Sequence, residues 1–225
     1  VTGDSAIYNQ MIHLKSFTFN PFQENTYVVW DETKEALIID PGCSDASERQ
    51  ELSDFITSEG LKVVKLLNTH CHIDHVLGNY FVQKTYGVSL HIHHKDIPVL
   101  KAVKTYAPNY GFPDYQEVEV GVELKEGTDI MFGNSSFEVL FVPGHAPGHV
   151  AFVNRAQKIC LSGDVLFRGS IGRTDLPGGN FEILLNSIKQ QLFPLGDDMV
   201  VYSGHGPSTT IGYERQWNPF VGENS

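Results

Sequence analysis

Apolar residues recur along the chain in short segments that follow two different periods. Between residues 11 and 40, apolar and polar positions alternate, which predicts a meander of three strands at 11–17, 25–30 and 36–40. Leu52, Phe55 and Ile56 then share one face of a predicted helix, and Gly60 is placed to end it. The apolar run at 62–67 predicts the next strand.

The remainder of the chain continues to alternate between strands and helices. A helix through Tyr80 is predicted to end near Gly87, followed by a strand at 88–93 and a helix at 95–106. Residues 107–126 are rich in proline, glycine and acidic residues, and we expect a surface loop with little regular structure. Further strands are predicted at 128–132, 136–142, 150–154 and 158–161, then a loop at 169–179, a helix capped by Asn180, and a last strand at 198–202. This order favours two sheets that are each covered by helices.

A dense group of potential metal ligands follows the strand predicted at 62–67. Residues 68–75 read Asn-Thr-His-Cys-His-Ile-Asp-His. The period of two along an extended chain directs His70 and His72 to one side, while Asp74 and His75 enter the following helix. Four ligands in six positions therefore predict a metal site. Cys71 points to the opposite side from its two neighbours and is expected in the core.

Three later residues of ligand type occupy a similar position, where an apolar strand runs into a glycine-rich turn. Strand ends gathered along one edge of a sheet can build a site on a rigid scaffold. Seven nitrogen and oxygen donors exceed the needs of one tetrahedral metal, so two divalent ions are predicted, with one carboxylate between them. Such donors suit zinc, iron or manganese, and zinc is the first expectation. The seven candidate ligands are His70, His72, Asp74, His75, His145, Asp164 and His205.

This pattern resembles the metallo-β-lactamase superfamily, whose signature is His-x-His-x-Asp-His. The resemblance covers nearly the whole chain and implies an α+β fold, a four-layer αββα sandwich formed by residues 1–225 as a single domain. It also implies two ligand triads with Asp164 between them. The first metal would be held by His70, His72 and His145, and the second by Asp74, His75 and His205.

Within the superfamily, residues 163–167 and 204–207 look most like the glyoxalase II-like branch, the hydroxyacylglutathione hydrolases. Full-length members of that branch carry a helical C-terminal domain that helps to bind glutathione. Here 20 residues follow His205, so we expect the catalytic domain without that helical domain.

The implied reaction is hydrolysis of a small acyl thioester, in which a hydroxide that bridges the metals attacks the carbonyl carbon. No Gly-x-Ser-x-Gly segment offers a protein nucleophile. Asp74 is expected to be a ligand first, with a catalytic role in steering the hydroxide or moving a proton. Arg173 is the candidate for binding a substrate carboxylate, and Asn25 and Tyr106 are candidates for the mouth of the site. Asp40 is as suitable for orienting a ligand histidine as for a turn.

Some residues near these motifs have simpler interpretations. His149 follows His145 by four positions, but it begins a strand, which favours a structural hydrogen bond over metal ligation. Arg168 is expected to be solvated or in an ion pair. His13, His91, His93 and His94 have no partner at a ligand spacing.

Alternative functions share most of these residues. Residues 68–72 also resemble the persulfide dioxygenases, in which one Fe(II) would be held by His70, His145 and Asp164. Residues 204–209 favour the hydrolase branch. Hydrolysis of a lactone or another ester, and metal binding without turnover, are further alternatives.

Composition and charge narrow the partners of the protein. The 225 residues, 41% of them hydrophobic, are enough for one sizeable core. A net charge of −11 repels phosphate backbones and anionic membranes, so no nucleic-acid or membrane partner is expected. No apolar run is long enough to cross a bilayer and the first residues do not form a signal sequence. Three cysteines without framework spacing fit a reducing compartment, which predicts a cytoplasmic protein.

Overall fold

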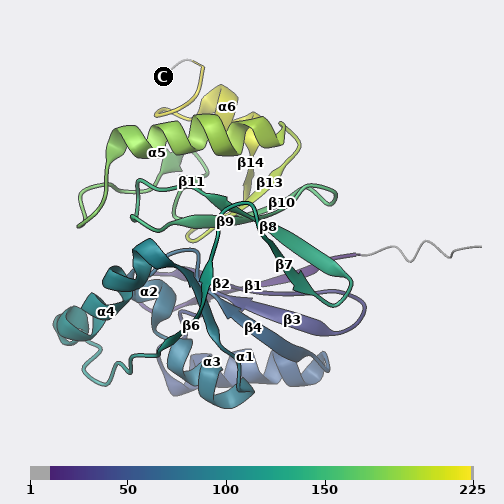
Figure 1. Ribbon diagram of the computed structural model, residues 1–225, viewed down its shortest axis with the longest axis vertical. Helices are drawn as coiled ribbons and strands as arrows, with labels where there is room; N and C mark the ends of the chain where they lie inside the picture. Colours follow the sequence, from purple (N-terminus) through teal and green to yellow (C-terminus); the bar gives the residue numbers. More distant parts are fainter. Residues whose placement is uncertain (1–10, 224–225) are drawn as a thin grey trace, which may run out of the picture.

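Two sheets packed face to face form the centre of the computed structural model, which describes residues 11–223. Helices cover the outer face of each sheet, so that the layers in Figure 1 run helix, sheet, sheet, helix from bottom to top. The predicted α+β fold with four αββα layers is confirmed.

The first sheet has the strand order β1-β2-β3-β4-β5-β6. Its first three strands form the predicted antiparallel meander, and β3 to β6 run parallel. The alternation seen in the sequence gives β2 and β3 two buried faces: Val28 and Ile38 face the helices, whereas Val29 and Leu37 face the other sheet. The strands are β1 His13–Phe19, β2 Glu24–Trp30, β3 Glu35–Ile39, β4 Lys62–Leu67, β5 Leu90–His93 and β6 Val120–Leu124.

Helices cover the outer face of the first sheet and provide its parallel crossovers (Figure 1). The first of them begins where the Asp45 carboxylate accepts a hydrogen bond from the Glu48 amide at 2.9 Å. The elements are α1 Ala46–Ser58, α2 Ile73–Val76, α3 Asn79–Tyr86 and α4 Ile97–Tyr106, with 3₁₀ turns η1 His94–Asp96 and η2 Ala107–Tyr110.

The second sheet has the order β14-β13-β10-β9-β8-β7. Its outer face is covered by the predicted helix α5, which Asn180 caps by accepting from the Ile183 amide at 3.0 Å, and by α6. The strands are β7 Asp129–Phe132, β8 Ser135–Phe141, β9 Val150–Asn154, β10 Ile159–Gly163, β13 Val200–Ser203 and β14 Thr209–Thr210, with a small hairpin of β11 Leu166–Phe167 and β12 Ser170–Ile171. The helices are α5 Phe181–Ser187, its π-helical continuation η3 Ile188–Leu192, η4 Phe193–Leu195 and α6 Ile211–Trp217.

Two sequence-based expectations about elements were wrong. The segment 107–126 is not only a loop, because η2 and β6, the edge strand of the first sheet, lie there. An edge strand has one neighbour, and Gly121, Val122 and Glu123 are exposed, so the segment lacks the buried alternation that identifies a strand. The strand at 198–202 is also not the last, since β14 and α6 follow it. Both are short, and Trp217 of α6 is 60% exposed.

Among the described residues, no helix is long and apolar enough to span a membrane.

Candidate metal centre

The seven candidate donors come together although they are spread from residue 70 to residue 205. They lie in four segments that follow β4, β8, β10 and β13, so one strand of the first sheet and three of the second hold them. The sequence predicts this convergence, because each group of donors directly follows an apolar strand. His70 and His72 follow β4, Asp74 and His75 lie in α2, His145 follows β8, Asp164 follows β10, and His205 follows β13.

Three histidines form the first group. His145 Nε2 lies 2.8 Å from His72 Nδ1 and 3.2 Å from His70 Nε2. His70 and His145 are both buried. Three imidazole nitrogens that point at a common position are typical of a metal site.

Asp74, His75 and His205 form the second group. His205 Nε2 lies 3.1 Å from Asp74 Oδ2, and His75 Nε2 lies 3.7 Å from the same oxygen. The His75 side chain is fully buried, whereas His205 and Asp74 retain 27% and 14% exposure. The second group is therefore the one that opens to solvent.

Asp164 lies between the two groups. Its Oδ1 atom is 3.4 Å from His75 Nε2, and its Oδ2 atom is 3.6 Å from His145 Nε2 and 3.5 Å from His205 Nε2. One carboxylate thus faces histidines of both groups, as the sequence predicts for a residue shared by two ions.

In His145 and His205, a hydrogen bond made by Nδ1 leaves Nε2, the nitrogen that faces the site, as an acceptor. His145 Nδ1 lies 2.8 Å from the Arg173 carbonyl, and His205 Nδ1 lies 3.2 Å from the Gln23 carbonyl. A carbonyl only accepts, so each Nδ1 carries the proton in the neutral ring and each Nε2 presents a lone pair to the site.

The same assignment holds for His70 and His75 through Asp40. Thr69 Oγ1 donates to Asp40 Oδ2 at 2.6 Å and can then accept from His70 Nδ1 at 3.1 Å. His75 Nδ1 donates to the same carboxylate oxygen at 3.2 Å. The Asp40 carboxylate also accepts from the Thr69 amide at 2.7 Å, so its oxygens are engaged in orienting the histidines. Of its two possible roles, the geometry fits the orienting one.

Two atoms at the centre of the site have no hydrogen-bond partner among the described residues. They are His75 Nε2 and Asp164 Oδ1, and both are buried. Buried polar atoms are normally satisfied, and two such atoms 3.4 Å apart fit a position where a cation would bind both. The donor set therefore fits divalent metal ions.

The electrostatics of the two groups differ. Burial lowers the pKa of His72 to about 3 and also lowers the pKa values of His70 and His145, so the first group consists of neutral imidazoles. In the second group, burial lowers the pKa of His205, but hydrogen bonds to Asp164 and Asp74 raise it to about 9.

In contrast to His205, the carboxylate of Asp164 has a lowered pKa. Burial raises the pKa of Asp164, but the charge of His75 and the hydrogen bond with His205 hold it well below its usual range. Asp74 and Asp164 thus remain ionised, and their negative charge keeps His75 and His205 protonated. A divalent cation would replace those protons, as metal binding generally does.

Other residues singled out from the sequence lie around this centre. Cys71 is fully buried in the core, as expected. His149 accepts a hydrogen bond from the Asp164 amide at 3.1 Å and stacks on His70 with ring centroids 4.6 Å apart, which is a structural role. Arg173 is exposed and paired with Asp175, whereas Arg168 stacks on Tyr213 of α6.

Asp96 is one residue that sequence reasoning missed. Its side chain is fully buried between two loops of the site, accepting from the Cys71 amide at 2.6 Å and from the Gly148 amide at 2.7 Å. In the sequence it lies in the first turn of the helix predicted at 95–106, where an aspartate is ordinary. The local sequence therefore does not distinguish an aspartate at a helix start from one that joins two loops.

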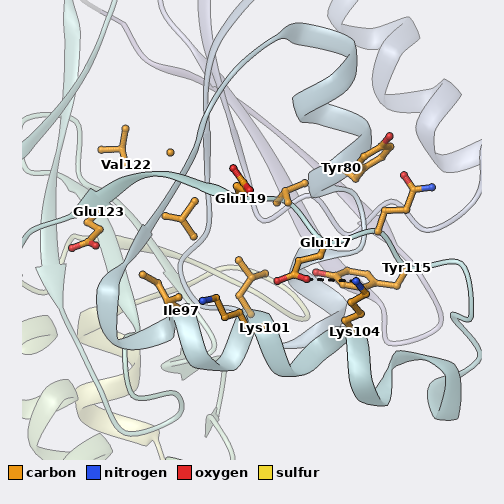
Figure 2. Close-up of a pocket in the computed structure, with 14 residues that line it drawn as sticks. Tyr80, Ile97, Lys101, Lys104, Tyr115, Glu117, Glu119, Val122 and Glu123 are labelled. Atoms are coloured by element: carbon orange, nitrogen blue, oxygen red, sulfur yellow. Dashed lines mark ion pairs between the residues drawn. The ribbon is translucent and has the colours of Figure 1, made fainter.

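A groove of about 900 Å³ lies away from this centre, between α4 and the segment that leads into β6 (Figure 2). Figure 2 shows Lys104 extending from α4 toward Glu117, with the ammonium nitrogen 3.9 Å from the carboxylate. None of the seven donors lines it. The convergence of donors, and not the size of this groove, therefore defines the candidate site.

Comparison with known families agrees with the fold and the donors. A model of the metallo-beta-lactamase superfamily matches residues 19–205, a range that contains all seven donors. The chain belongs to the metallo-β-lactamase superfamily.

Three similar proteins place the chain more closely. Hydroxyacylglutathione hydrolase GloC of Haemophilus influenzae is 38% identical over 206 residues, covering 91% of this chain and 95% of that protein. The crystal structure of the B3 metallo-beta-lactamase BLEG-1 has a TM-score of 0.85 at 36% identity, covering 93% of this chain and 99% of that one. TTHA1623 in a di-iron-bound form has a TM-score of 0.81 at 38% identity, covering 92% and 99%. Family and relatives together indicate a metal-dependent hydrolase.

Proposed function

We propose that the protein is a dinuclear metal-dependent thioesterase of the hydroxyacylglutathione hydrolase kind. The observation that carries the proposal is Asp164, whose carboxylate faces histidines of both groups. The similarity to GloC over nearly the whole of both chains supports a glutathione thioester as the substrate class.

In this proposal each group of donors holds one ion. His70, His72 and His145 would hold the first ion, the second group would hold the other, and Asp164 would be shared between them. When bound, such ions lower the pKa of a water molecule and polarise the carbonyl group that it attacks. We propose zinc as the metal because imidazole and carboxylate donors suit it, and iron as the alternative, which the di-iron form of TTHA1623 supports.

The protein's own side chains supply orientation and proton transfer. Asp40 and the carbonyls of Arg173 and Gln23 fix the ring orientation of the ligand histidines. Asp74 is a ligand whose carboxylate is also partly exposed, so it is placed to move a proton between the site and solvent.

Arg173 is proposed to bind a carboxylate of the substrate. Its guanidinium forms two hydrogen bonds of 2.7 Å with Asp175, and both side chains are more than 60% exposed, so the pair is open to exchange. A substrate carboxylate would offer the same bidentate geometry.

The arrangement favours this function over the iron-dependent oxidation of a persulfide. A single iron held by His70, His145 and Asp164 would give His72 no role. His72 Nδ1 nevertheless lies 2.8 Å from His145 Nε2, within the first donor group. We place the reaction in the cytoplasm because Cys43, Cys71 and Cys160 are all free thiols in the core. The net charge of −11 supports a small-molecule substrate without a nucleic-acid or membrane partner.

The test begins with metal content per chain, measured by elemental analysis on protein prepared without chelator. We expect about two ions per chain and cleavage of a lactoyl-glutathione thioester. Parallel assays with a glutathione persulfide, a lactone and a β-lactam test the other reactions of this fold. One iron per chain with oxygen uptake, or turnover restricted to the lactone or β-lactam, would contradict the thioesterase proposal.

The variant Asp164→Asn tests the shared carboxylate. We expect it to reduce the metal content and to lower kcat/KM by at least about a thousandfold, while the circular dichroism spectrum stays unchanged. Asp129→Asn, at the exposed start of β7, is the matched control and should retain both metal and activity. Full turnover by Asp164→Asn would remove the assignment.

A further inference from the structure

Four aromatic side chains form a continuous row beside the second donor group. Phe22 comes from the turn between β1 and β2, and the others come from the end of α4 and the segment after it. Ring centroids lie 6.1 Å apart for Phe22 and Tyr110, 6.3 Å for Phe22 and Phe112, and 5.7 Å for Tyr106 and Tyr110. We call Phe22, Tyr106, Tyr110 and Phe112 the aromatic rim.

The turn that carries Phe22 is fixed directly to the candidate site. Asn20 Nδ2 donates to the Asp74 carbonyl at 3.0 Å, and the Gln23 carbonyl accepts from His205 Nδ1 at 3.2 Å. The Phe22 amide donates to Asn20 Oδ1 at 3.0 Å, which closes the turn. Phe22 therefore lies one residue from a direct contact with a donor of the second group.

The rim combines two supported rings with two exposed ones. Tyr106 and Phe112 pack against the core cluster, whereas Phe22 and Tyr110 are 38% and 54% exposed. Isolated exposed aromatic residues are ordinary, but contacting rings held on a fixed turn form a rigid apolar surface. Such a surface binds apolar groups without ordering flexible side chains.

Arg173 lies beside the first donor group. Its carbonyl accepts from His145, which belongs to the first donor group. The mouth of the site thus has a cationic side next to the first group and an apolar side next to the second.

We propose that the aromatic rim binds an apolar group of the substrate and makes the enzyme selective for thioesters that combine an apolar arm with an anionic arm. The selectivity rests on the proposed thioesterase activity. The anionic arm pairs with Arg173, and the apolar arm, on the acyl or the thiol side, packs on Phe22 and Tyr110.

Kinetics with two matched series of thioesters test the rim. One series varies the acyl group on glutathione from acetyl to phenylacetyl, and the other varies the thiol of an acetyl thioester from a methyl to a benzyl substituent. In Phe22→Ala and Tyr110→Ala, we expect kcat/KM for the phenyl-bearing member of one series to fall about tenfold, with less than about a twofold change for the small member. The series that responds identifies the arm.

Trp217→Ala is the matched control, because Trp217 is an exposed aromatic residue on α6, over the other sheet. It should leave both series unchanged. An equal loss for small and phenyl-bearing substrates, or no loss for either, would overturn the rim as a selectivity surface.

Binding of thioethers separates this inference from the proposed reaction. S-benzylglutathione and S-methylglutathione are not hydrolysed, so calorimetric titration of the metal-loaded protein measures the rim without turnover. We expect the benzyl compound to bind more tightly and Phe22→Ala to remove the difference. Thioester cleavage without any preference in binding or kinetics would leave the proposed function and overturn the rim, whereas a binding preference without cleavage would do the reverse.

Discussion

Asp96 joins two loops of the candidate site through a single carboxylate. One oxygen accepts from the amide of Cys71, between two donor histidines, and the other accepts from Gly148, in the loop of His145. Burial raises the pKa of Asp96 to about 6, although both amide hydrogen bonds lower it. The residue thus contributes position and no donor atom, which explains why a search for ligands in the sequence passes over it.

Replacing Asp96 tests this role. Asp96→Ala leaves two buried amides without an acceptor, and we expect the free energy of unfolding to fall by roughly 3 kcal/mol. Urea denaturation of the metal-free protein measures the change.

Asp198→Ala is the control for this measurement. Asp198 is 70% exposed and pairs with Lys158 at 3.5 Å on the surface, so its loss should cost less than about 1 kcal/mol. Equal destabilisation by the two variants would contradict the role assigned to Asp96.

At the scale of elements, the loop that presents His145 is held against helix α5. The Gly144 carbonyl accepts from the Asn180 amide at 2.7 Å, just before the first turn of that helix. Gly144 has φ of +128°, a conformation that side chains strongly disfavour, and an added Cβ would overlap the backbone of Leu184.

Gly144→Ala should therefore destabilise the protein and displace His145. The backbone strain alone costs roughly 1–3 kcal/mol, and the overlap with α5 adds to it. Thermal unfolding measures this loss, and metal titration measures the effect on the first donor group. Gly60→Ala is the comparison, since Gly60 also has positive φ, at +64°, but has open space around it. A loss no larger for Gly144→Ala than for Gly60→Ala would show that the α5 contact does not matter.

The elements that sequence reasoning predicted are those with strong local signals. Strands β2, β3 and β4 have buried residues on both faces, and α5 has an Asn180 cap with apolar residues on one face, so pattern and structure agree. Strand β6 was missed because its order comes from pairing with β5 and not from burial. Local pattern does not record pairing between segments far apart in the chain.

The residues of the candidate site also differ in whether the sequence could reveal them. His70 to His75 form a motif that is visible in the sequence, and the later donors share its position after an apolar strand. The turn at Gln23 and the buried Asp96 contact the site only through tertiary hydrogen bonds. Such contacts depend on the packing of the loops, so ligand types and spacing could not reveal them.

At the scale of the whole molecule, one apolar layer joins the two sheets. Val29 and Leu37 of the first sheet share a buried cluster with Phe137 and Phe152 of the second. Because the layer belongs to both sheets, neither can separate without exposing it, and we expect the chain to unfold as one cooperative unit.

Phe152→Ala tests this cooperativity. Phe152 is fully buried, and its truncation should cost about 3–5 kcal/mol while a single transition is retained. Coincident unfolding curves from tryptophan fluorescence and far-ultraviolet circular dichroism measure it. Met131→Ala, which removes a side chain that is 53% exposed, should change little. Two separated transitions would indicate that the sheets unfold independently.

The division of the donors between the sheets also affects the lifetime of the protein in a cell. His70 to His75 follow a strand of the first sheet, whereas His145, Asp164 and His205 follow strands of the second. An ion held by both sets binds the folded chain in preference to the unfolded one, and an ion concentration a thousand times Kd adds about 4 kcal/mol to the free energy of unfolding. Starvation for metal would therefore increase the population open to proteolysis, so the supply of metal would set the abundance of the protein as well as its activity.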